Sequence, residues 1–265
     1  MNKVHLSEEV NEFSQHLREA EETHHSVKAL TDIKKDLSMD EAYQIQLATI
    51  QNKVEAGAHI IGMKIGLTSV AMQELLGVNE PDYGHLLDTM VVSNGGSVTK
   101  ERVLQPKVEG EVAFILKKEL QGPHVTKEDV LNATDYVVPA IEIVDSRISD
   151  WKIKLEDTIA DNASSGLYVL GDNKTSVDEV DLAEVKMDLY KNGELMNSGK
   201  GSAALDHPAN CVAWLANKMA DYNKSLKPGD VILSGALSAA VNSQPGDEFS
   251  VKMEPIGEVS VRFVP

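Results

Sequence analysis

Val108-Glu-Gly-Glu-Val-Ala-Phe-Ile-Leu116 is an apolar run that carries two acidic side chains, Glu109 and Glu111. A second apolar run, Val137-Val-Pro-Ala-Ile-Glu-Ile-Val144, carries Glu142. In an extended strand, residues two apart lie on the same face, about 6.5 Å from each other. We expect both apolar runs to be strands. Glu109 and Glu111 would then lie on one face and could reach one point in space.

Acidic side chains in buried strands need a positive partner. An unpaired carboxylate in apolar surroundings is costly, and the sequence offers no evident set of basic partners for these acids. A divalent cation would neutralise them, and oxygen ligands favour Mg²⁺, Mn²⁺ or Ca²⁺ over zinc. Gly110 leaves room for a close approach. The sequence thus predicts a metal site made of Glu109, Glu111 and Glu142.

Composition limits the classes of protein to which the chain can belong. Its 265 residues are 42% hydrophobic and 25% charged, enough for a substantial core in one large or two small domains. The formal net charge of −17 argues against non-specific binding to nucleic acid or to an anionic membrane. The single cysteine, Cys211, excludes an intrachain disulfide and a cysteine-based zinc site. Without a secretory signal at Met1 or a membrane-spanning apolar stretch, we expect a reducing cytoplasm.

Local patterns predict an α+β fold. Apolar residues recur at helical spacing near the N-terminus, at Val10, Phe13, Leu17 and Ala20. Ser38-Met-Asp-Glu41 matches a capping box at the start of a second helix, so residues 1–60 are expected to form a helical N-terminal region. Short β-rich runs bounded by Gly, Pro, Asn and Asp lie at 103–116, 136–144, 166–170, 186–190, 231–234 and 249–253. Residues 61–265 are thus expected to form a mixed, largely antiparallel, metal-binding β domain.

Two helices and one hairpin are expected within the β-rich part. Thr126-Lys-Glu-Asp129 matches a helix start, and that helix is expected to reach Asp135. Pro208 opens another helix that is expected to end near Tyr222. Asn192-Gly193 is a strong signal for a hairpin turn.

Three further residues have both a functional and a structural interpretation. Lys64 lies in the apolar segment Ile60-Ile-Gly-Met-Lys-Ile-Gly66. Buried there, it could donate a proton or hold an anion, but it could also reach solvent from a strand end. Asp82 follows a proline and is a natural turn residue. Ser164 lies in the small-polar loop Asp161-Asn-Ala-Ser-Ser-Gly166, which could bind a carboxylate or be an ordinary loop.

A set of motifs extends over nearly the whole chain. They are Lys64-Ile-Gly-Leu-Thr-Ser69, Pro81-Asp-Tyr-Gly84, Arg102-Val-Leu-Gln-Pro-Lys-Val-Glu-Gly-Glu111, Ile141-Glu-Ile-Val-Asp-Ser-Arg147, Asp150-Trp151, Asp161-Asn-Ala-Ser164 and Ile232-Leu-Ser-Gly-Ala-Leu237. Together they resemble the 2-keto-4-pentenoate hydratases (2-hydroxypenta-2,4-dienoate hydratases) of the fumarylacetoacetate hydrolase superfamily. Because it rests on many motifs, the resemblance is more specific than any one of them.

The resemblance implies roles for the candidate residues. The three acids would hold Mg²⁺ or Mn²⁺, and Lys64 and Asp82 would carry out acid–base chemistry instead of being a surface lysine and a turn residue. Ser164 would bind the substrate carboxylate. Two positions depart from the family pattern: Ser165 stands where a cysteine is usual, and Met63 stands where an arginine commonly precedes the lysine. The second departure bears on substrate choice.

The implied reaction is the hydration of 2-hydroxypenta-2,4-dienoate to 4-hydroxy-2-oxopentanoate. Lys64 would stabilise or protonate the enolate, and Asp82 would deprotonate the water that adds at C4. A 4-oxalocrotonate decarboxylase is the nearest alternative, but it needs no water-activating base at Asp82. A non-catalytic metal-binding module is a second alternative. The resemblance also implies a homo-oligomer built from pentamers, with a small 2-oxo or 2-hydroxydienoate substrate as the partner.

Overall fold

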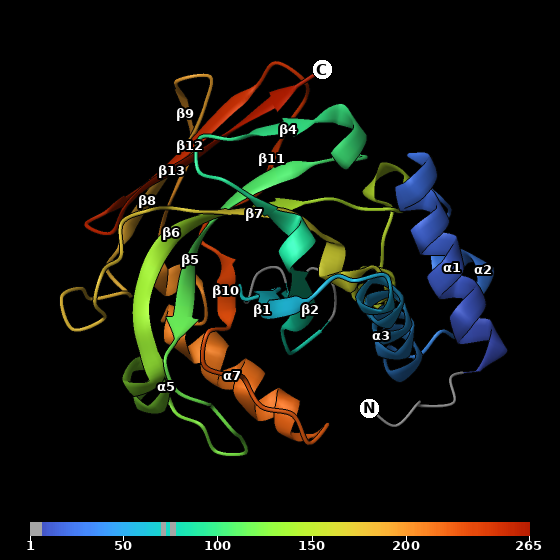
Figure 1. Ribbon diagram of the computed structural model, residues 1–265, viewed down its shortest axis with the longest axis horizontal. Helices are drawn as coiled ribbons and strands as arrows, with labels where there is room; N and C mark the ends of the chain where they lie inside the picture. Colours follow the sequence, from blue (N-terminus) through green and yellow to red (C-terminus); the bar gives the residue numbers. More distant parts are fainter. Residues whose placement is uncertain (1–6, 70–72, 75–77) are drawn as a thin grey trace.

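Three helices form the N-terminal part of the chain and lie together at one side of the molecule (Figure 1). The computed structural model describes residues 7–69, 73–74 and 78–265. The three helices are α1 (Glu8–Thr23), α2 (Leu30–Ile33) and α3 (Met39–Glu55). Ser38 and Glu41 form the predicted capping box and so satisfy free backbone N–H groups at the start of α3. The recurring apolar residues of α1 are buried, and α1 packs against α3.

The larger sheet carries both acidic runs. Its eight strands, counted over the described residues, follow the order β2-β1-β10-β5-β6-β7-β3, with β11 paired to β5. They are β1 (Ile60–Gly66), β2 (Asp82–Leu87), β3 (Val91–Val92), β5 (Lys107–Leu116), β6 (Thr134–Val144), β7 (Ser165–Leu170), β10 (Val231–Ala236) and β11 (Val241–Asn242). The acidic runs become β5 and β6, which are antiparallel neighbours near the middle of the sheet. Central strands of this kind are buried on both faces, which explains their apolar composition.

The smaller sheet packs against β5. Its order is β4-β13-β12-β8-β9, and its strands are β4 (Ser97–Thr99), β8 (Lys186–Lys191), β9 (Glu194–Lys200), β12 (Glu248–Glu254) and β13 (Gly257–Val264). A Cβ atom at Gly110 would lie 3.0 Å from Sδ of Met187 and 3.2 Å from the side chain of Val251. Gly110 therefore leaves room for a close approach, as predicted, and the element that approaches is the smaller sheet.

The remaining helices and turns connect the strands. They are α5 (Lys127–Ala133), α6 (Leu155–Ala160), α7 (Pro208–Ala220), and the short 3₁₀ turns η1 (Asp88–Met90), η2 (Lys100–Arg102), η3 (Ser149–Trp151), η4 (Asn162–Ser164) and η5 (Gly201–Ala203). The predicted helix at Pro208 is confirmed, whereas α5 stops short of Asp135 because β6 already begins at Thr134. Asn192 and Gly193 both have positive φ, as their two-residue hairpin requires, and they join β8 to β9.

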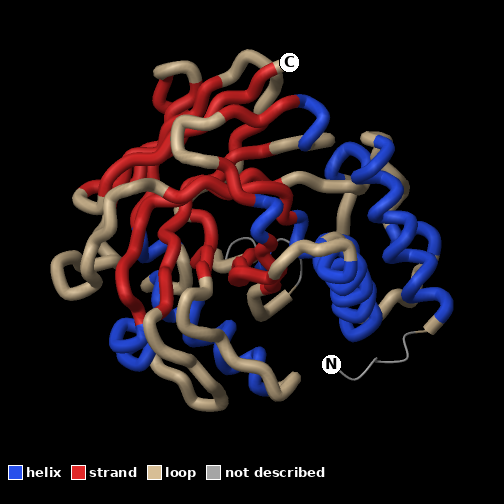
Figure 2. The backbone as a smooth tube through the Cα atoms, in the orientation of Figure 1, coloured by secondary structure: helices blue, strands red, loops and turns tan. Residues whose placement is uncertain are grey.

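The α+β fold class is confirmed. Strands occupy the centre and upper part of the molecule, while the long helices lie to the right of them and below them (Figure 2). Among the strand pairs of the described chain, β1 with β10, β3 with β7 and β4 with β13 are parallel, and the other pairs are antiparallel. Within the ranges the structure describes, no helix combines the length and apolar character that a membrane span needs.

Candidate active site

The pairing of β5 with β6 brings the three acids together. The register sets Glu109 directly opposite Glu142, and Glu111 follows two residues later on the same face. One carboxylate oxygen from each of the three lies within 4.8 Å of the others. Glu111 and Glu142 are buried and Glu109 is half-buried. The register and the side-chain alternation of β5 and β6 therefore place the three acids in one cluster.

The oxygens of this cluster are poorly satisfied by the protein. Glu142 is 0% exposed, yet neither of its carboxylate oxygens has a hydrogen-bond partner among the residues described. In Glu111, Oε2 accepts a hydrogen bond of 2.8 Å from the backbone N–H of Gly235. Unused oxygens on a buried carboxylate are costly unless a cation takes them up. The donor set, three clustered carboxylates of which Glu142 accepts no hydrogen bond from the described residues, fits a hard divalent cation.

Lys64 lies beside the acids on β1. Its Nζ is 3.3 Å from Oε2 of Glu142 and donates a hydrogen bond of 3.1 Å to the carbonyl oxygen of Ala163. The residue is only 4% exposed, so the interpretation as a lysine that reaches solvent from a strand end is wrong. A single ammonium group among several carboxylates leaves an excess of negative charge, which is a condition that favours binding of a further cation.

Asp82 is the first residue of β2 and pairs with Gly66 of β1. The expected turn at this aspartate is therefore corrected to the start of a strand. Asp82 is 3% exposed, and its Oδ1 has no hydrogen-bond partner within the described part of the chain. A Cβ atom at Gly66 would lie 2.2 Å from this oxygen and 3.2 Å from Nζ of Lys64. The missing side chain of Gly66 thus opens the space into which both functional groups point.

Burial and mutual charge shift the pKa values of the cluster. Burial, with the charge of Glu142, raises the pKa of Glu109 to about 7. The same two causes raise the pKa of Glu111, and burial raises the pKa of Asp82 in spite of the nearby Lys64. Burial alone would lower the pKa of Lys64, but the charges of Glu142, Asp82 and Glu111 together raise it. Lys64 therefore stays protonated at neutral pH.

Ser164 lies in the η4 turn, next to the carbonyl group that Lys64 contacts. The φ angles of Asn162, Ala163 and Ser164 are 56°, 52° and 51°, all left-handed. Each such angle in a residue other than glycine costs on the order of 1–2 kcal/mol. The hydroxyl group of Ser164 is 3.0 Å from that of Thr158, with which it shares a hydrogen bond. The structure brings Ser164 to the edge of the site, while its role toward a carboxylate stays a prediction.

Two buried polar residues near the site were not among the predicted site residues. Asn162 accepts a hydrogen bond of 2.8 Å from the N–H of His85 and donates one of 2.9 Å to the carbonyl of the same residue. Gln46 of α3 donates to the carbonyl groups of Tyr83 and Ile159, at 3.0 and 2.8 Å. They tie β2 to the η4 turn and to α3. A signal existed for Gln46, because the residues three and four positions away on its helix face are mostly apolar.

Fold and site define a class of protein: a β-rich enzyme whose candidate centre combines three carboxylates that could hold a metal ion with a buried lysine and a buried aspartate. The family model for the C-terminal part of fumarylacetoacetate (FAA) hydrolase matches residues 53–264, and the chain belongs to this family. This result confirms the resemblance seen in the motifs.

Relatives named as hydratases match four fifths or more of the chain. A 2-hydroxyhexa-2,4-dienoate hydratase of Comamonas testosteroni is 45% identical over 251 residues, which is 94% of this chain and 95% of that protein. A 2-hydroxypent-2,4-dienoate hydratase of Pseudomonas putida is 50% identical over 214 residues, which is 80% of this chain and 96% of that protein.

A solved structure with the same fold belongs to an enzyme named for another reaction. The 4-oxalocrotonate decarboxylase of Pseudomonas putida G7, complexed with magnesium and adipate, superimposes with a TM-score of 0.95 at 36% sequence identity. The match covers 99% of this chain and 100% of that one. The chain is therefore similar both to proteins named as hydratases and to one named as a decarboxylase.

Proposed function

We propose that this protein is a hydro-lyase that adds water to 2-hydroxypenta-2,4-dienoate and releases 4-hydroxy-2-oxopentanoate. The proposal rests on one observation above all, the buried Asp82 that shares the space over Gly66 with Lys64 beside the acidic cluster. Water addition needs an acid and a base within reach of one substrate, and this arrangement supplies both. The two relatives named as hydratases support the same assignment.

The metal would be Mg²⁺ or Mn²⁺, held by Glu109, Glu111 and Glu142. When bound, it would supply Lewis-acid polarisation of the C2 oxygen of the substrate. Two observations support this assignment: the Glu142 oxygens accept no hydrogen bond within the described part of the chain, and the cluster carries an excess of negative charge.

The protein's own residues would move the protons. Lys64 would donate its Nζ proton to C5 and would take up the proton that the C2 hydroxyl group loses, so that it ends the step protonated again. Asp82 would then accept a proton from the attacking water as hydroxide adds at C4. C3 would take a proton from Lys64, to which the protonated Asp82 would return one. The raised pKa of Asp82 brings the carboxylate closer to the range in which a base works near neutral pH. Ser164 would hold the substrate carboxylate from the η4 turn.

A 4-oxalocrotonate decarboxylase is the second candidate, because the neighbour with that name shares the fold at a TM-score of 0.95. Decarboxylation has no use for a base that activates water, and Asp82 therefore favours hydration. A purified-enzyme assay distinguishes the two: 2-hydroxypenta-2,4-dienoate and its dicarboxylate analogue are each supplied with and without Mg²⁺ or Mn²⁺. Loss of dienol absorbance without CO₂ supports hydration. Stoichiometric CO₂ from the dicarboxylate would replace the proposal, and no turnover at all would leave a metal-binding module.

The assembly and the compartment are proposed on the family resemblance. The homo-oligomer would be built from pentamers and would work in the cytoplasm. Light scattering on the purified protein measures the assembly, and a molar mass that is not a multiple of five chains would contradict it.

A further inference from the structure

We propose that Arg147 and Asp161 are positioning residues that hold the η4 turn so that the carbonyl oxygen of Ala163 faces the ammonium group of Lys64. The catalytic consequence of this inference rests on the proposed function, whereas the structural consequence can be measured without it.

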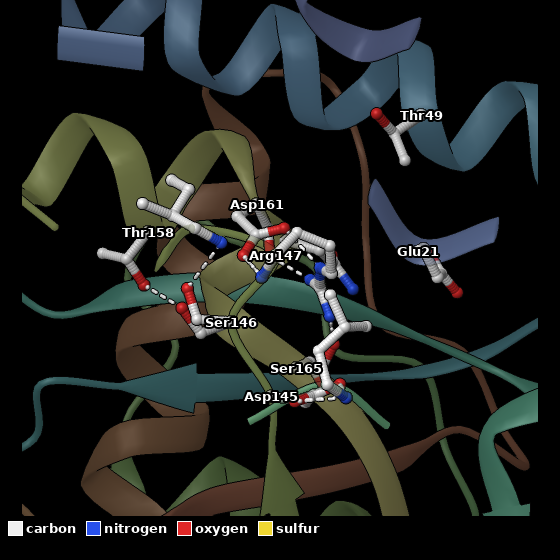
Figure 3. A network of polar contacts seen from close by, with 12 residues as sticks. Glu21, Thr49, Asp145, Ser146, Arg147, Thr158, Asp161 and Ser165 are labelled. Atoms are coloured by element: carbon white, nitrogen blue, oxygen red, sulfur yellow. Dashed lines mark hydrogen bonds and ion pairs between the residues drawn. The ribbon is translucent and has the colours of Figure 1, made fainter. Parts of the chain in front are cut away.

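Arg147 binds both ends of the turn. Its Nη1 donates a hydrogen bond of 2.9 Å to the carbonyl oxygen of Ser165, directly after η4. Its Nη2 donates to the carbonyl oxygen of Asp161, directly before η4, and its Nε donates to the carboxylate of the same residue. The backbone N–H of Arg147 donates to the other carboxylate oxygen at 2.9 Å. Figure 3 shows the guanidinium group between Asp161 and Ser165.

The turn needs such support because its backbone is unfavourable on its own. Asn162, Ala163 and Ser164 all have left-handed φ angles, and none of them is glycine. Strained conformations of this kind persist only when the surroundings hold them in place. Asn162 is fixed on one side by its two hydrogen bonds to the backbone of His85. Arg147 supplies the second support, at the two chain ends of the turn.

The burial of the pair fits positioning better than stability. Arg147 is 7% and Asp161 is 3% exposed. Removing two charges from water largely offsets the attraction between them, so that a buried ion pair is weak evidence for stability. Here the pair instead fixes the position of the backbone, because a planar guanidinium group can hold several acceptors in one fixed geometry. The turn that is held in this way carries the carbonyl oxygen of Ala163, which lies 3.1 Å from Nζ of Lys64.

A cavity gives experimental access to this pair. Arg147, Asp161 and Ser165 line a cavity of about 580 Å³, across which Glu21 and Thr49 lie on α1 and α3 (Figure 3). Its wall includes exposed residues of α1 and of the segment after it, so the cavity reaches the surface. Truncation of Arg147 would join its volume to this cavity, and a free guanidinium ion from solution could then occupy the vacated place.

The test is the variant Arg147→Ala with guanidinium rescue. A misplacement of about 1 Å at a reacting group can reduce the rate by on the order of 10²-fold, and we expect a loss of this size in kcat, with KM and Mg²⁺ affinity little changed. Millimolar guanidinium chloride should restore much of kcat, whereas urea at the same concentration should not. The matched control is Arg262→Ala, which removes an exposed arginine that lies 3.9 Å from Glu248 and should neither lose activity nor respond to guanidinium.

Amide hydrogen exchange gives a readout that does not depend on turnover. In the metal-free protein, Arg147→Ala should speed exchange at residues 161–165, and guanidinium should slow it again. Exchange that is unchanged in the variant would overturn the inference, and so would a kcat loss that guanidinium does not reverse. If the wild type lacks hydratase activity, but Arg147→Ala still speeds exchange at residues 161–165 and guanidinium slows it again, only the proposed function is overturned.

A second variant covers the case in which Arg147→Ala fails to fold. Asp161→Asn keeps the size of the side chain but removes the charge that Arg147 binds. It should speed exchange in the same segment and lower kcat, and guanidinium should not rescue it because Arg147 is still in place. Normal exchange at residues 161–165 in this variant would also overturn the inference.

Discussion

The ammonium nitrogen of Lys64 lies 3.3 Å from Oε2 of Glu142, a buried carboxylate to which no hydrogen bond is donated within the described residues. One positive charge therefore already touches the acid that is proposed as a metal ligand. A divalent cation bound there would be repelled by the ammonium group while both are attracted by the same acids. Lys64 and the proposed metal would thus both stabilise the negative charge of the cluster, but the two would not be interchangeable.

Replacement of Lys64 separates metal binding from catalysis. In Lys64→Met a neutral side chain of similar length removes the repulsion, so Mg²⁺ affinity should be kept or increased. Hydration should fall by ~10²–10⁴-fold, the usual contribution of a positioned acid. Calorimetric titration with Mg²⁺ and steady-state assays measure the two effects. Lys227→Met, at an exposed lysine that pairs with Glu119, is the control. Metal affinity and activity that fall together would make Lys64 a structural part of the metal site.

Substitution by alanine should have different effects on activity at Gly66 and at Gly110. A methyl group at Gly66 would meet Oδ1 of Asp82 at 2.2 Å, whereas one at Gly110 would meet the flexible Met187 side chain at 3.0 Å. Gly66→Ala should therefore abolish most activity by displacing Asp82. Gly110→Ala should keep kcat but lower stability by about 1–3 kcal/mol, as overpacking does. Assays and thermal scans of both variants provide the comparison, and equal activity in the two would contradict it.

The sequence predicts the acidic cluster well because it rests on strand alternation. Glu109 and Glu111 are two residues apart in one strand, so their common face follows from period two. Their meeting with Glu142 depends on the register between β5 and β6, which no local pattern fixes. That step is predicted from the cost of three buried carboxylates, which one shared cation would relieve. The expected domain boundary near residue 60 stays a prediction.

The rest of the site depends on backbone geometry that leaves little trace in the sequence. The η4 turn is left-handed at three residues without a glycine, so its residue types do not indicate its shape. Pro81-Asp-Tyr-Gly84 has the composition of a turn, yet Asp82 begins β2, which pairs with β1. Gly84 instead lets this strand approach η4 closely. The partnership of Arg147 with Asp161 joins residues 14 positions apart and becomes visible only in three dimensions.

Metal removal should lower stability in a way that depends on Glu142. A cation that binds only the folded state stabilises it by an amount that grows with concentration, about 2.7 kcal/mol at 100 times Kd. Mg²⁺ should therefore raise the melting temperature of the wild type well above its value in EDTA. In Glu142→Gln a neutral amide replaces a charged ligand, so the rise should be much smaller and activity should be lost. Melting curves that superimpose with and without Mg²⁺, or full activity in EDTA, would refute the metal site.

The buried His85 should make the free energy of unfolding depend on pH. Burial, with the charge of Lys224, lowers the pKa of His85 to about 4 from an ordinary value of 6.5. At pH 5 the unfolded chain binds a proton on its histidine that the folded chain does not. The contribution of the neutral His85 to the free energy of unfolding is therefore fully present above pH ~6.5 and is lost as the pH falls toward ~4. Relative to His85→Gln, the wild type should lose on the order of 3 kcal/mol over this range. Denaturant unfolding in EDTA at several pH values measures it, and a difference that does not vary with pH would contradict the assignment.

Asp82→Asn tests whether Asp82 is the base for water addition. The variant keeps the acidic cluster and Lys64 but cannot take a proton from water, so hydroxide is no longer delivered to C4. Proton transfer to C5 does not need that water. The variant should still exchange C5 hydrogen for solvent deuterium, while formation of 4-hydroxy-2-oxopentanoate falls by ~10²–10⁴-fold. Nuclear magnetic resonance in D₂O follows both processes in one sample. An equal loss of exchange and hydration would place Asp82 in the enolisation step, and no loss of either would leave it without a catalytic role.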